Sequence, residues 1–469
     1  MDKYNARTGE VNPPCASVSL PAMPEPRNMD NMENQVPARI ANILINALKG
    51  GVVPRVGLEY ITVGRAQEIA AILHDIDMIS DGGASFRFIV GKYGSGKSFL
   101  LQTIRNYATA KGFAVVDADL SPERRFAGTK GQGLATYKEL IKNLSTKSKP
   151  DGGALSLILE RWISGIQSAV KAETDLDGEA FDREVEKRIY VVAGSLEGMV
   201  NGFEFAKAVV AYWRAYRQDD AAIKSCVLKW FRGEYASRRE AKADLDINFI
   251  VTDETWYDFL KIFAVFLVNA GYKGLLVLID ELVNIFKIPN SITRQNNYEK
   301  ILTMYNDVLQ GKAQHIGFLM GGTPQCIEDK YKGLFSYEAL RSRLAEGHFA
   351  ADGLKDLSAP IIRLNMLTQE EMYVLVEKLR DIHARLYGYE PLLSHDDLLY
   401  FLTVEYNRVG ADTHITPREI IRDFIELAGI LHQNPHTSVA DILGSNSFEM
   451  AKGGLNDEDI HADFQEFEV

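Results

Sequence analysis

Apolar positions along this chain alternate between short continuous runs and stripes at helical spacing. The continuous runs predict buried strands at Phe86–Val90, Phe113–Ala118, Gly274–Ile279 and His315–Met320, with a further strand-like run at Ile361–Leu364. A helical stripe that ends at Gly112 separates the first two runs. Parallel strands need long crossovers, and helices usually supply them. The alternation therefore predicts an α/β fold in which helices cover a parallel sheet.

Helical periodicity dominates two other stretches of the chain. Residues 151–250 show almost no strand character, which predicts a large helical insertion between the second and third strands. Residues 365–445 are again helical throughout, which predicts a C-terminal helical lid. Shorter helices are expected at Pro37–Lys49 and Ala66–Leu73. The strands then fall into two parts of one core, residues 37–150 and 251–364.

The composition is that of a soluble globular protein. Of 469 residues, 46% are apolar and 25% charged, and no run approaches the roughly 18 apolar residues that a membrane span needs. Residues 1–36 lack an apolar signal core and predict a disordered arm, and residues 446–469 predict an acidic tail. Cys15, Cys226 and Cys326 lie far apart without metal-binding spacing, which is typical of the reducing cytoplasm.

The strongest chemical signal follows the first predicted strand. The segment Gly91–Ser98 reads GKYGSGKS and lies between that strand and a predicted helix. Glycines let backbone N–H groups turn towards phosphates, Lys97 would neutralise them, and Ser98 would ligate Mg²⁺. A chance glycine-rich turn would not need both flanks. The residues predicted to bind a nucleoside triphosphate are Gly91, Lys92, Tyr93, Gly94, Ser95, Gly96, Lys97, Ser98 and Phe99.

A pair of acids follows the third predicted strand. Asp280 ends an unbroken apolar run, as a residue that holds Mg²⁺ does in a phosphate-loop sheet. Glu281 would polarise the attacking water. Acids also end strands as helix caps, but a chain with a phosphate loop favours the catalytic interpretation. Together the two segments predict hydrolysis of the bound nucleotide.

Four further polar residues are candidates for the same site. Thr323 ends the fourth strand, where it would contact the γ-phosphate or the lytic water, or simply form a turn. Arg341 and Arg343 are alternative arginine fingers that would reach a neighbouring subunit's phosphate, or surface salt-bridge residues. Arg418 begins a helix of the C-terminal region and would lie over the nucleotide, or in solvent.

These motifs, in this order, resemble the AAA+ ATPases and, among them, the origin-recognition-like branch. More narrowly, the chain resembles the BREX-system ATP-binding proteins of phage defence over residues 37–435. The segments that carry this resemblance include Gly51-Val52-Val53-Pro54, Val63-Gly64-Arg65, Gly271-Tyr272-Lys273-Gly274-Leu275, Asn296-Asn297-Tyr298 and Tyr337-Glu338-Ala339-Leu340.

The resemblance implies ATP and Mg²⁺ as cofactors. It also implies a homo-oligomer with partner proteins from the same defence system. Thr323 would be sensor 1, Arg343 the finger in trans and Arg418 sensor 2. The interval between Lys97 and Asp280 is longer than a compact AAA+ core requires, which assigns the helical insertion to this branch.

DNA or RNA is left open as a partner. Aromatic and basic residues mix within the insertion, at Trp213, Tyr216, Trp230, Phe231, Arg232, Arg238, Arg239 and Lys242. They would stack bases and grip phosphates, although a helical core with a charged outer face is favoured. Arg124-Arg125 is another candidate contact. A net charge of −12 argues only against a protein that coats nucleic acid with its whole surface. A nucleotide-stabilised scaffold or switch without turnover is the alternative function.

Overall fold

The computed structural model describes residues 36–194, 202–345, 356–407 and 416–444. The predicted N-terminal arm, apart from its last residue, and the whole of the predicted acidic tail lie outside these ranges. The fold is built on a sheet of five parallel strands in the order β2-β3-β4-β1-β5. The strands are β1 Ala84–Gly91, β2 Ala114–Asp119, β3 Leu275–Asp280, β4 Ile316–Gly322 and β5 Ile361–Leu364. Every strand that the apolar runs predict is confirmed to within two residues at each end.

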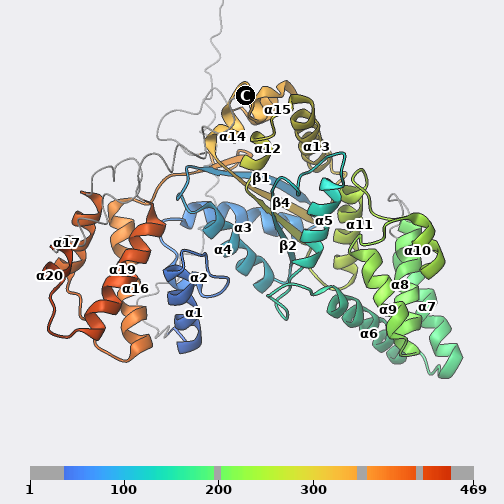
Figure 1. Cartoon of the computed structure of the whole chain (residues 1–469). Coiled ribbons are helices and arrows are strands. Elements are labelled where there is room, and N and C mark those ends of the chain that lie inside the picture. The colour runs from blue at the N-terminus through green and yellow to red at the C-terminus, as the bar shows by residue number, and fades with distance from the viewer. Residues whose placement is uncertain (1–35, 195–201, 346–355, 408–415, 445–469) are drawn as a thin grey trace, which may run out of the picture.

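Helices cover both faces of the sheet (Figure 1). On one face, α3 (Ala66–Ser80) and α4 (Lys97–Ala110) pack against alternate strand residues such as Ile89 and Leu278. On the other face, α11 (Trp256–Asn269) and α13 (Ser291–Leu309) are part of a larger core. Successive strand residues point to opposite faces, so a strand covered on both sides is apolar throughout. The remaining helices of this part are α5 Gln132–Lys142, α12 Val283–Phe286, α14 Pro324–Glu328, η2 Leu334–Ser336 and α15 Glu338–Leu344.

The helix predicted at Ala66–Leu73 is too short. Its structural counterpart, α3, continues to Ser80 because the apolar stripe continues through Ile76 and Ile79, both buried. A buried acid on this helix, Asp75, interrupts the stripe. The ion pair that Asp75 forms with the first strand explains how a charge is accommodated there.

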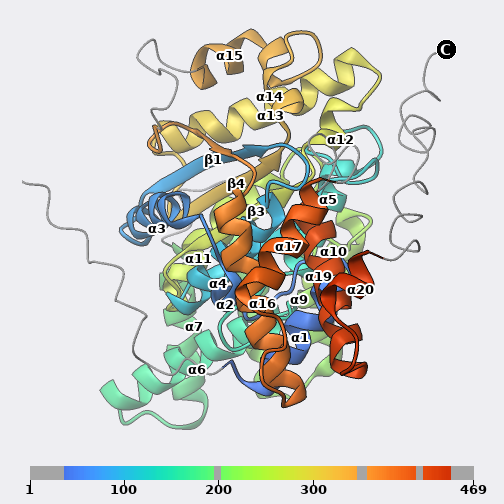
Figure 2. The same cartoon turned by 90° about the vertical axis from the view of Figure 1, so that its left-hand side faces the viewer.

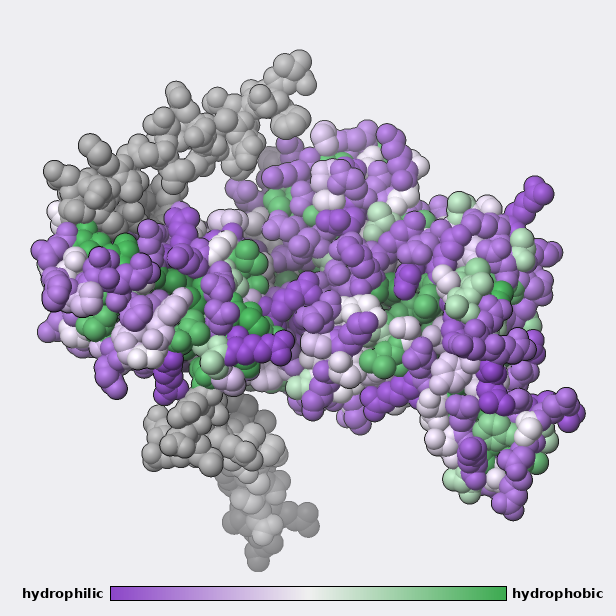
Figure 3. Space-filling view, turned by 60° about the horizontal axis from the view of Figure 1, so that its bottom comes forward, coloured by the Kyte–Doolittle hydropathy of each residue, from purple (hydrophilic) through white to green (hydrophobic). Residues whose placement is uncertain are grey.

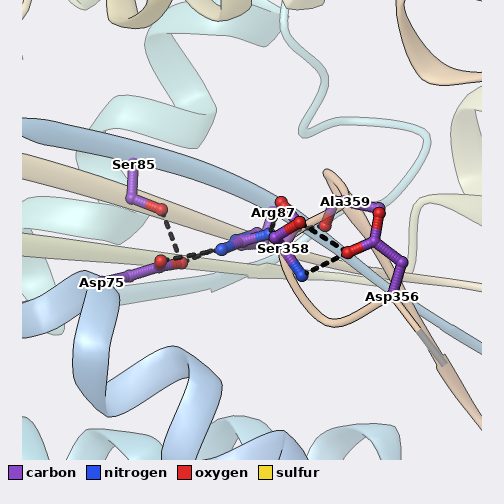
Figure 4. A network of polar contacts seen from close by, with 6 residues as sticks. All are labelled: Asp75, Ser85, Arg87, Asp356, Ser358 and Ala359. Atoms are coloured by element: carbon purple, nitrogen blue, oxygen red, sulfur yellow. Dashed lines mark hydrogen bonds and ion pairs between the residues drawn. The ribbon is translucent and has the colours of Figure 1, made fainter. Parts of the chain in front are cut away.

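That ion pair belongs to a polar network that fastens the edge strand β5 (Figure 4). Arg87 on β1 donates from Nε and Nη2 to the two oxygens of Asp75, at 2.6 and 2.8 Å, and Ser85 donates to the same carboxylate. The remaining guanidinium nitrogen of Arg87 donates to the carbonyls of Ser358 and Ala359, just before β5. The half-buried side chain of Arg87 therefore links α3, β1 and the approach to β5.

Helices also fill the interval between β2 and β3, where no strand occurs within the described residues. They are α6 Leu155–Glu173, α7 Gly178–Gly194, α8 Gly202–Arg217, α9 Ala221–Phe231 and α10 Arg238–Leu245, and they lie on the right in Figure 1. Trp213, Trp230 and Phe231 are each 1% exposed in a core continuous with the sheet. These rings therefore form a helical core, and they are not available to stack on bases.

The C-terminal helices have a core of their own, shared with the first helices of the chain (Figure 2). Leu44 of α1 packs in one cluster with Val376 of α16 and Phe424 of α19, all fully buried. The helices concerned are α1 Ala38–Lys49, α2 Leu58–Ile61, α16 Gln369–Tyr387, α17 His395–Tyr406, α19 Pro417–Gln433 and α20 Val439–Leu443. The two ends of the described chain thus meet beside the sheet.

The surface turned to the viewer in Figure 3 is mainly hydrophilic. Hydrophobic residues gather on its left, where the C-terminal helices approach the sheet. No helix in the described ranges is both long and apolar enough to cross a membrane.

Candidate functional site

The loop between β1 and α4 presents free backbone donors. Gly94 and Gly96 have φ values of 80° and 85°, in the left-handed region that glycine adopts without strain. Gly96 precedes the first residue of α4, and no side chain among the described residues caps that helix start. The N–H groups of the first turn are therefore open to a ligand, and the helix dipole favours an anion there. This loop is built as an anion cradle.

Two of the loop glycines also permit close packing. A Cβ atom on Gly91 would lie 2.3 Å from Ser95 Oγ, and one on Gly94 would lie 3.0 Å from Cβ of Thr416. Thr416 caps α19 of the C-terminal helices. The loop therefore touches the C-terminal helices directly at Gly94, where a side chain would push the two apart.

The side chain of Lys97 is held in place by backbone carbonyls of this loop. Its Nζ donates to the carbonyls of Gly91 and Lys92, each at 3.0 Å. Burial lowers the pKa of Lys97, while the charges of Asp280 and Glu281 act in the opposite direction. An ammonium group carries three donors, so two of them fix its position and one is left for an incoming anion.

Ser98, in the first turn of α4, contacts Asp280 at the end of β3. The serine Oγ donates to Asp280 Oδ2 at 2.6 Å, and the backbone N–H of Glu281 donates to Oδ1 at 2.8 Å. A Cβ atom on Gly321 would lie 2.3 Å from that Oδ1, so β4 leaves room for the carboxylate only because it has glycine there. A hydroxyl beside one carboxylate matches the protein ligands of a Mg²⁺ ion completed by phosphates and water.

Glu281 has a strained backbone at the opening of the site. Its φ of 61° is left-handed, which costs energy for a residue with a side chain. Burial and the nearby charges of Asp280 and Asp119 raise the pKa of Glu281. A carboxylate with a raised pKa is a stronger base, so the position suits a group that withdraws a proton from water.

A cavity of about 280 Å³ connects these residues. Lys97, Ser98 and Glu281 line its polar end, together with the loop glycines. Its apolar side draws on the N-terminal helices and on the C-terminal helices, with Val53, Ile61, Val63, Leu367, Leu375 and Ile421. Such a cleft, apolar at one end and rich in donors at the other, suits a ligand with a flat apolar ring and anionic groups.

Arg418 reaches the cavity from the C-terminal helices. It occupies the first turn of α19, whose start is fixed by a capping box between Thr416 and Glu419. Its guanidinium donates to the hydroxyl of Tyr93 at 3.3 Å and lies 5.9 Å from the centre of that ring. The structure therefore places Arg418 over the loop, with its side chain still exposed.

Arg65 is a residue of the site for which the sequence suggested no role. It is 7% exposed, and its Nη2 donates to the carbonyls of Ser95 and Asn365 at 3.0 and 2.6 Å. These bonds connect the loop between β1 and α4, here called the anion loop, to the segment that leads into the C-terminal helices. The only sequence signal was the Gly64-Arg65 pair, because a buried arginine cannot be distinguished from an exposed one by pattern.

Thr323 follows β4, the strand between β1 and β3. Its hydroxyl oxygen is buried and forms no hydrogen bond with any described residue. It is not among the described residues that line the cavity. An unsatisfied buried hydroxyl is unusual and calls for a partner, such as water or a ligand oxygen.

The two candidate fingers lie elsewhere on the molecule. On α15, Arg341 pairs with Glu338 at 2.7 Å, and Arg343 donates to Asn306 and to the carbonyl of Ala339. Both side chains are exposed, and neither is among the described residues that line the cavity. Within one chain, the structure does not bring these arginines to the loop.

Comparison with known proteins identifies a family for this chain. No curated protein matches the sequence. A family model described as "BREX system ATP-binding protein BrxC/D" matches residues 36–447, which include every described residue of the sheet and of both helical regions. With its phosphate-loop architecture and this match over most of its length, the chain belongs to the family of BREX system ATP-binding proteins BrxC/D.

Proposed function

We propose that this protein binds and hydrolyses ATP as part of a prokaryotic antiviral defence system of the BREX type. The observation that carries the proposal is the contact of Ser98 with Asp280 at 2.6 Å beside the uncapped start of α4. This contact joins a magnesium-ligating pair to an anion cradle. Membership of an ATP-binding family in phage defence supports both parts of the proposal.

In this proposal the cavity holds the whole nucleotide. The first-turn N–H groups of α4 and the ammonium of Lys97 bind the phosphates, and Arg418 adds a second cation from the opposite side. The apolar side takes the base. Because that side is built from two separate groups of helices, occupancy of the cavity would hold the C-terminal helices, the proposed lid, against the sheet.

For hydrolysis, Glu281 orients a water molecule and accepts its proton. Its raised pKa, caused first by burial, favours proton uptake. Ser98 and Asp280 would hold Mg²⁺, which supplies charge neutralisation between the phosphates. The unsatisfied hydroxyl of Thr323 supports a role as a sensor of the terminal phosphate or the water.

The proposed enzyme is completed by a second copy of the chain. The exposure of Arg341 and Arg343 supports a finger offered to a neighbour's site. ATP would control partner proteins of the defence system through the domains of each chain. These are the two core parts, residues 37–150 and 251–364, the helical insertion 151–250 and the lid 365–445.

The test is ATP turnover by wild type and variants, measured with and without Mg²⁺. We expect Lys97→Ala to lose binding, and Glu281→Gln to bind ATP but hydrolyse it at least about 100-fold more slowly. The matched control is Glu299→Gln on the exposed face of α13, which should leave the rate unchanged. Wild-type turnover no higher than that of Lys97→Ala would refute hydrolysis. If bound ATP then persisted unhydrolysed, the protein would be the nucleotide-stabilised scaffold or switch.

A further inference from the structure

A tight turn between α14 and η2 displays an aromatic ring between two lysines. The turn runs from Asp329 to Gly333, and Lys330, Tyr331 and Lys332 are all exposed. The Tyr331 side chain is 87% exposed, the largest fraction for a large apolar or aromatic side chain in the described part of the chain. At this exposure, the ring has little packing against the described residues that would explain its position.

Hydrogen bonds define the shape of the turn. Asp329 accepts hydrogen bonds from the N–H groups of Tyr331 and Lys332, both at 2.7 Å, and these bonds hold the pKa of Asp329 below its usual range. Tyr298 of α13 donates its hydroxyl to the carbonyl of Lys332. A Cβ atom on Gly333 would lie 2.7 Å from the carbonyl oxygen of Asp329, so the turn closes only with glycine there. The exposed ring is therefore presented on a fixed frame.

The charges around the ring favour an anionic partner. The acids next to the turn are already engaged, because Glu328 pairs with Arg363 and Asp329 accepts from the backbone. Lys330 and Lys332 are then two adjacent cations on a protein of net charge −12. A ring with a cation on each side can stack on a base while the lysines neutralise the flanking phosphates.

We propose that the Lys330-Tyr331-Lys332 turn binds single-stranded nucleic acid, with the Tyr331 ring stacked on a base. A convex turn reaches only bases that are already unstacked, which excludes the interior of a duplex. The inference goes beyond the proposed ATPase function and does not require hydrolysis. The proposed binding turn is nevertheless connected to the proposed ATPase site, since only the five-residue helix α14 separates Thr323 from this turn.

The experiment is binding of a fluorescent 30-nucleotide poly-dT strand, followed by anisotropy. Tyr331→Ala should weaken binding by about 5- to 100-fold, and Tyr331→Phe, which keeps the ring, should restore it. Lys330→Gln and Lys332→Gln should each reduce the salt dependence of log Kd by about 0.7. The matched control is Tyr400→Ala on α17, where the side chain is 43% exposed and affinity should not change.

A second readout tests the contact itself. Ultraviolet crosslinking of a strand that contains 5-iododeoxyuridine should label the peptide that includes Tyr331. Equal binding by wild type and Tyr331→Ala, a preference for duplex, or crosslinks confined to other peptides would each overturn the proposal. ATP binding measured on the same samples keeps this result separate from any failure of the nucleotide site.

Discussion

The phosphate-loop site depends on a few residues whose surroundings disfavour their ionised forms. Lys97 is partly buried and Glu281 lies exposed at the opening of the site, and desolvation acts against the ionised form of each. Glu281 also carries a left-handed backbone. Such strain persists only where the surrounding structure enforces it, and here the carboxylate of Asp280 holds the Glu281 N–H. The site therefore costs stability, as expected of groups selected for chemistry.

This cost gives a prediction at the residue scale. Burial, Asp280 and Asp119 raise the pKa of Glu281, so at neutral pH the folded protein carries an unfavourable charge. Well below pH 4 the carboxyl is protonated in both the folded and unfolded states, because glutamate in an unfolded chain titrates at about 4.3. Glu281→Gln should therefore raise the melting temperature at pH 7, and the gain should vanish as the pH falls below about 4.

Thermal unfolding of both proteins across this pH range measures the effect. Glu299→Gln, on an exposed helix face, should show no such gain. A lower melting temperature for Glu281→Gln at pH 7 would mean that the carboxylate makes a net stabilising contact in the folded state.

At the scale of elements, the edge strand β5 depends on one arginine. Arg87 joins Asp75 on α3 to the carbonyls before β5, and the Asp75 side chain is only 3% exposed (Figure 4). Hydrogen bonding to Asp75 raises the pKa of Arg87, so the guanidinium stays ionised. β5 in turn lies against the anion loop, because Leu364 pairs with Gly91. The network thus supports the loop from the far end of the strands.

The prediction for this element is a loss of stability from breaking the pair. Arg87→Met leaves a buried carboxylate without its cation and should cost about 3–5 kcal/mol of unfolding free energy. Denaturant unfolding checks this value. The double variant Asp75→Asn with Arg87→Met should lose less than Arg87→Met alone, and the surface variant Arg39→Met should stay within about 0.5 kcal/mol of wild type. Equal losses in the single and double variants would show that the charge on Asp75 is not the cause.

At the scale of the whole molecule, the site lies where two cores meet. The anion loop belongs to the sheet, whereas α1, α2 and the C-terminal helices form a separate cluster that lines the other side of the cavity. Arg65 and Arg418 bridge the two. A ligand that fills this cavity binds both cores at once, which is how ATP could alter the shape presented to a partner.

The same scale includes the proposed oligomer. We expect ATP to increase the mass measured by size-exclusion chromatography with light scattering. Arg343→Ala should bind ATP normally but lose at least about 1000-fold in hydrolysis, as expected of a finger in trans. Arg341, which already pairs with Glu338, serves as the matched control, so Arg341→Ala should remain active. The reverse result would make Arg341 the finger, and full activity in both variants would exclude a finger on α15.

The local parts of this protein were readable from the sequence alone. Gly91–Ser98 and the apolar runs fixed the loop and the strands, because each depends on neighbours within about ten residues and on burial that leaves a periodic trace. The start of α19 was equally local, since Thr416 and Glu419 cap it within one turn. The helix α3 was predicted too short because the buried Asp75 resembles a surface residue in sequence.

Contacts between distant segments were decided by the tertiary structure. Ser98 and Asp280 stand 182 positions apart, and only the strand order brings them to one edge of the sheet. The same folding buries Trp213 and Trp230 while leaving Tyr331 in solvent, a difference that aromatic content cannot reveal. Side-chain type and spacing therefore determined which chemistry the chain carries. Topology, through long-range burial, decided which of those groups meet and which face a partner.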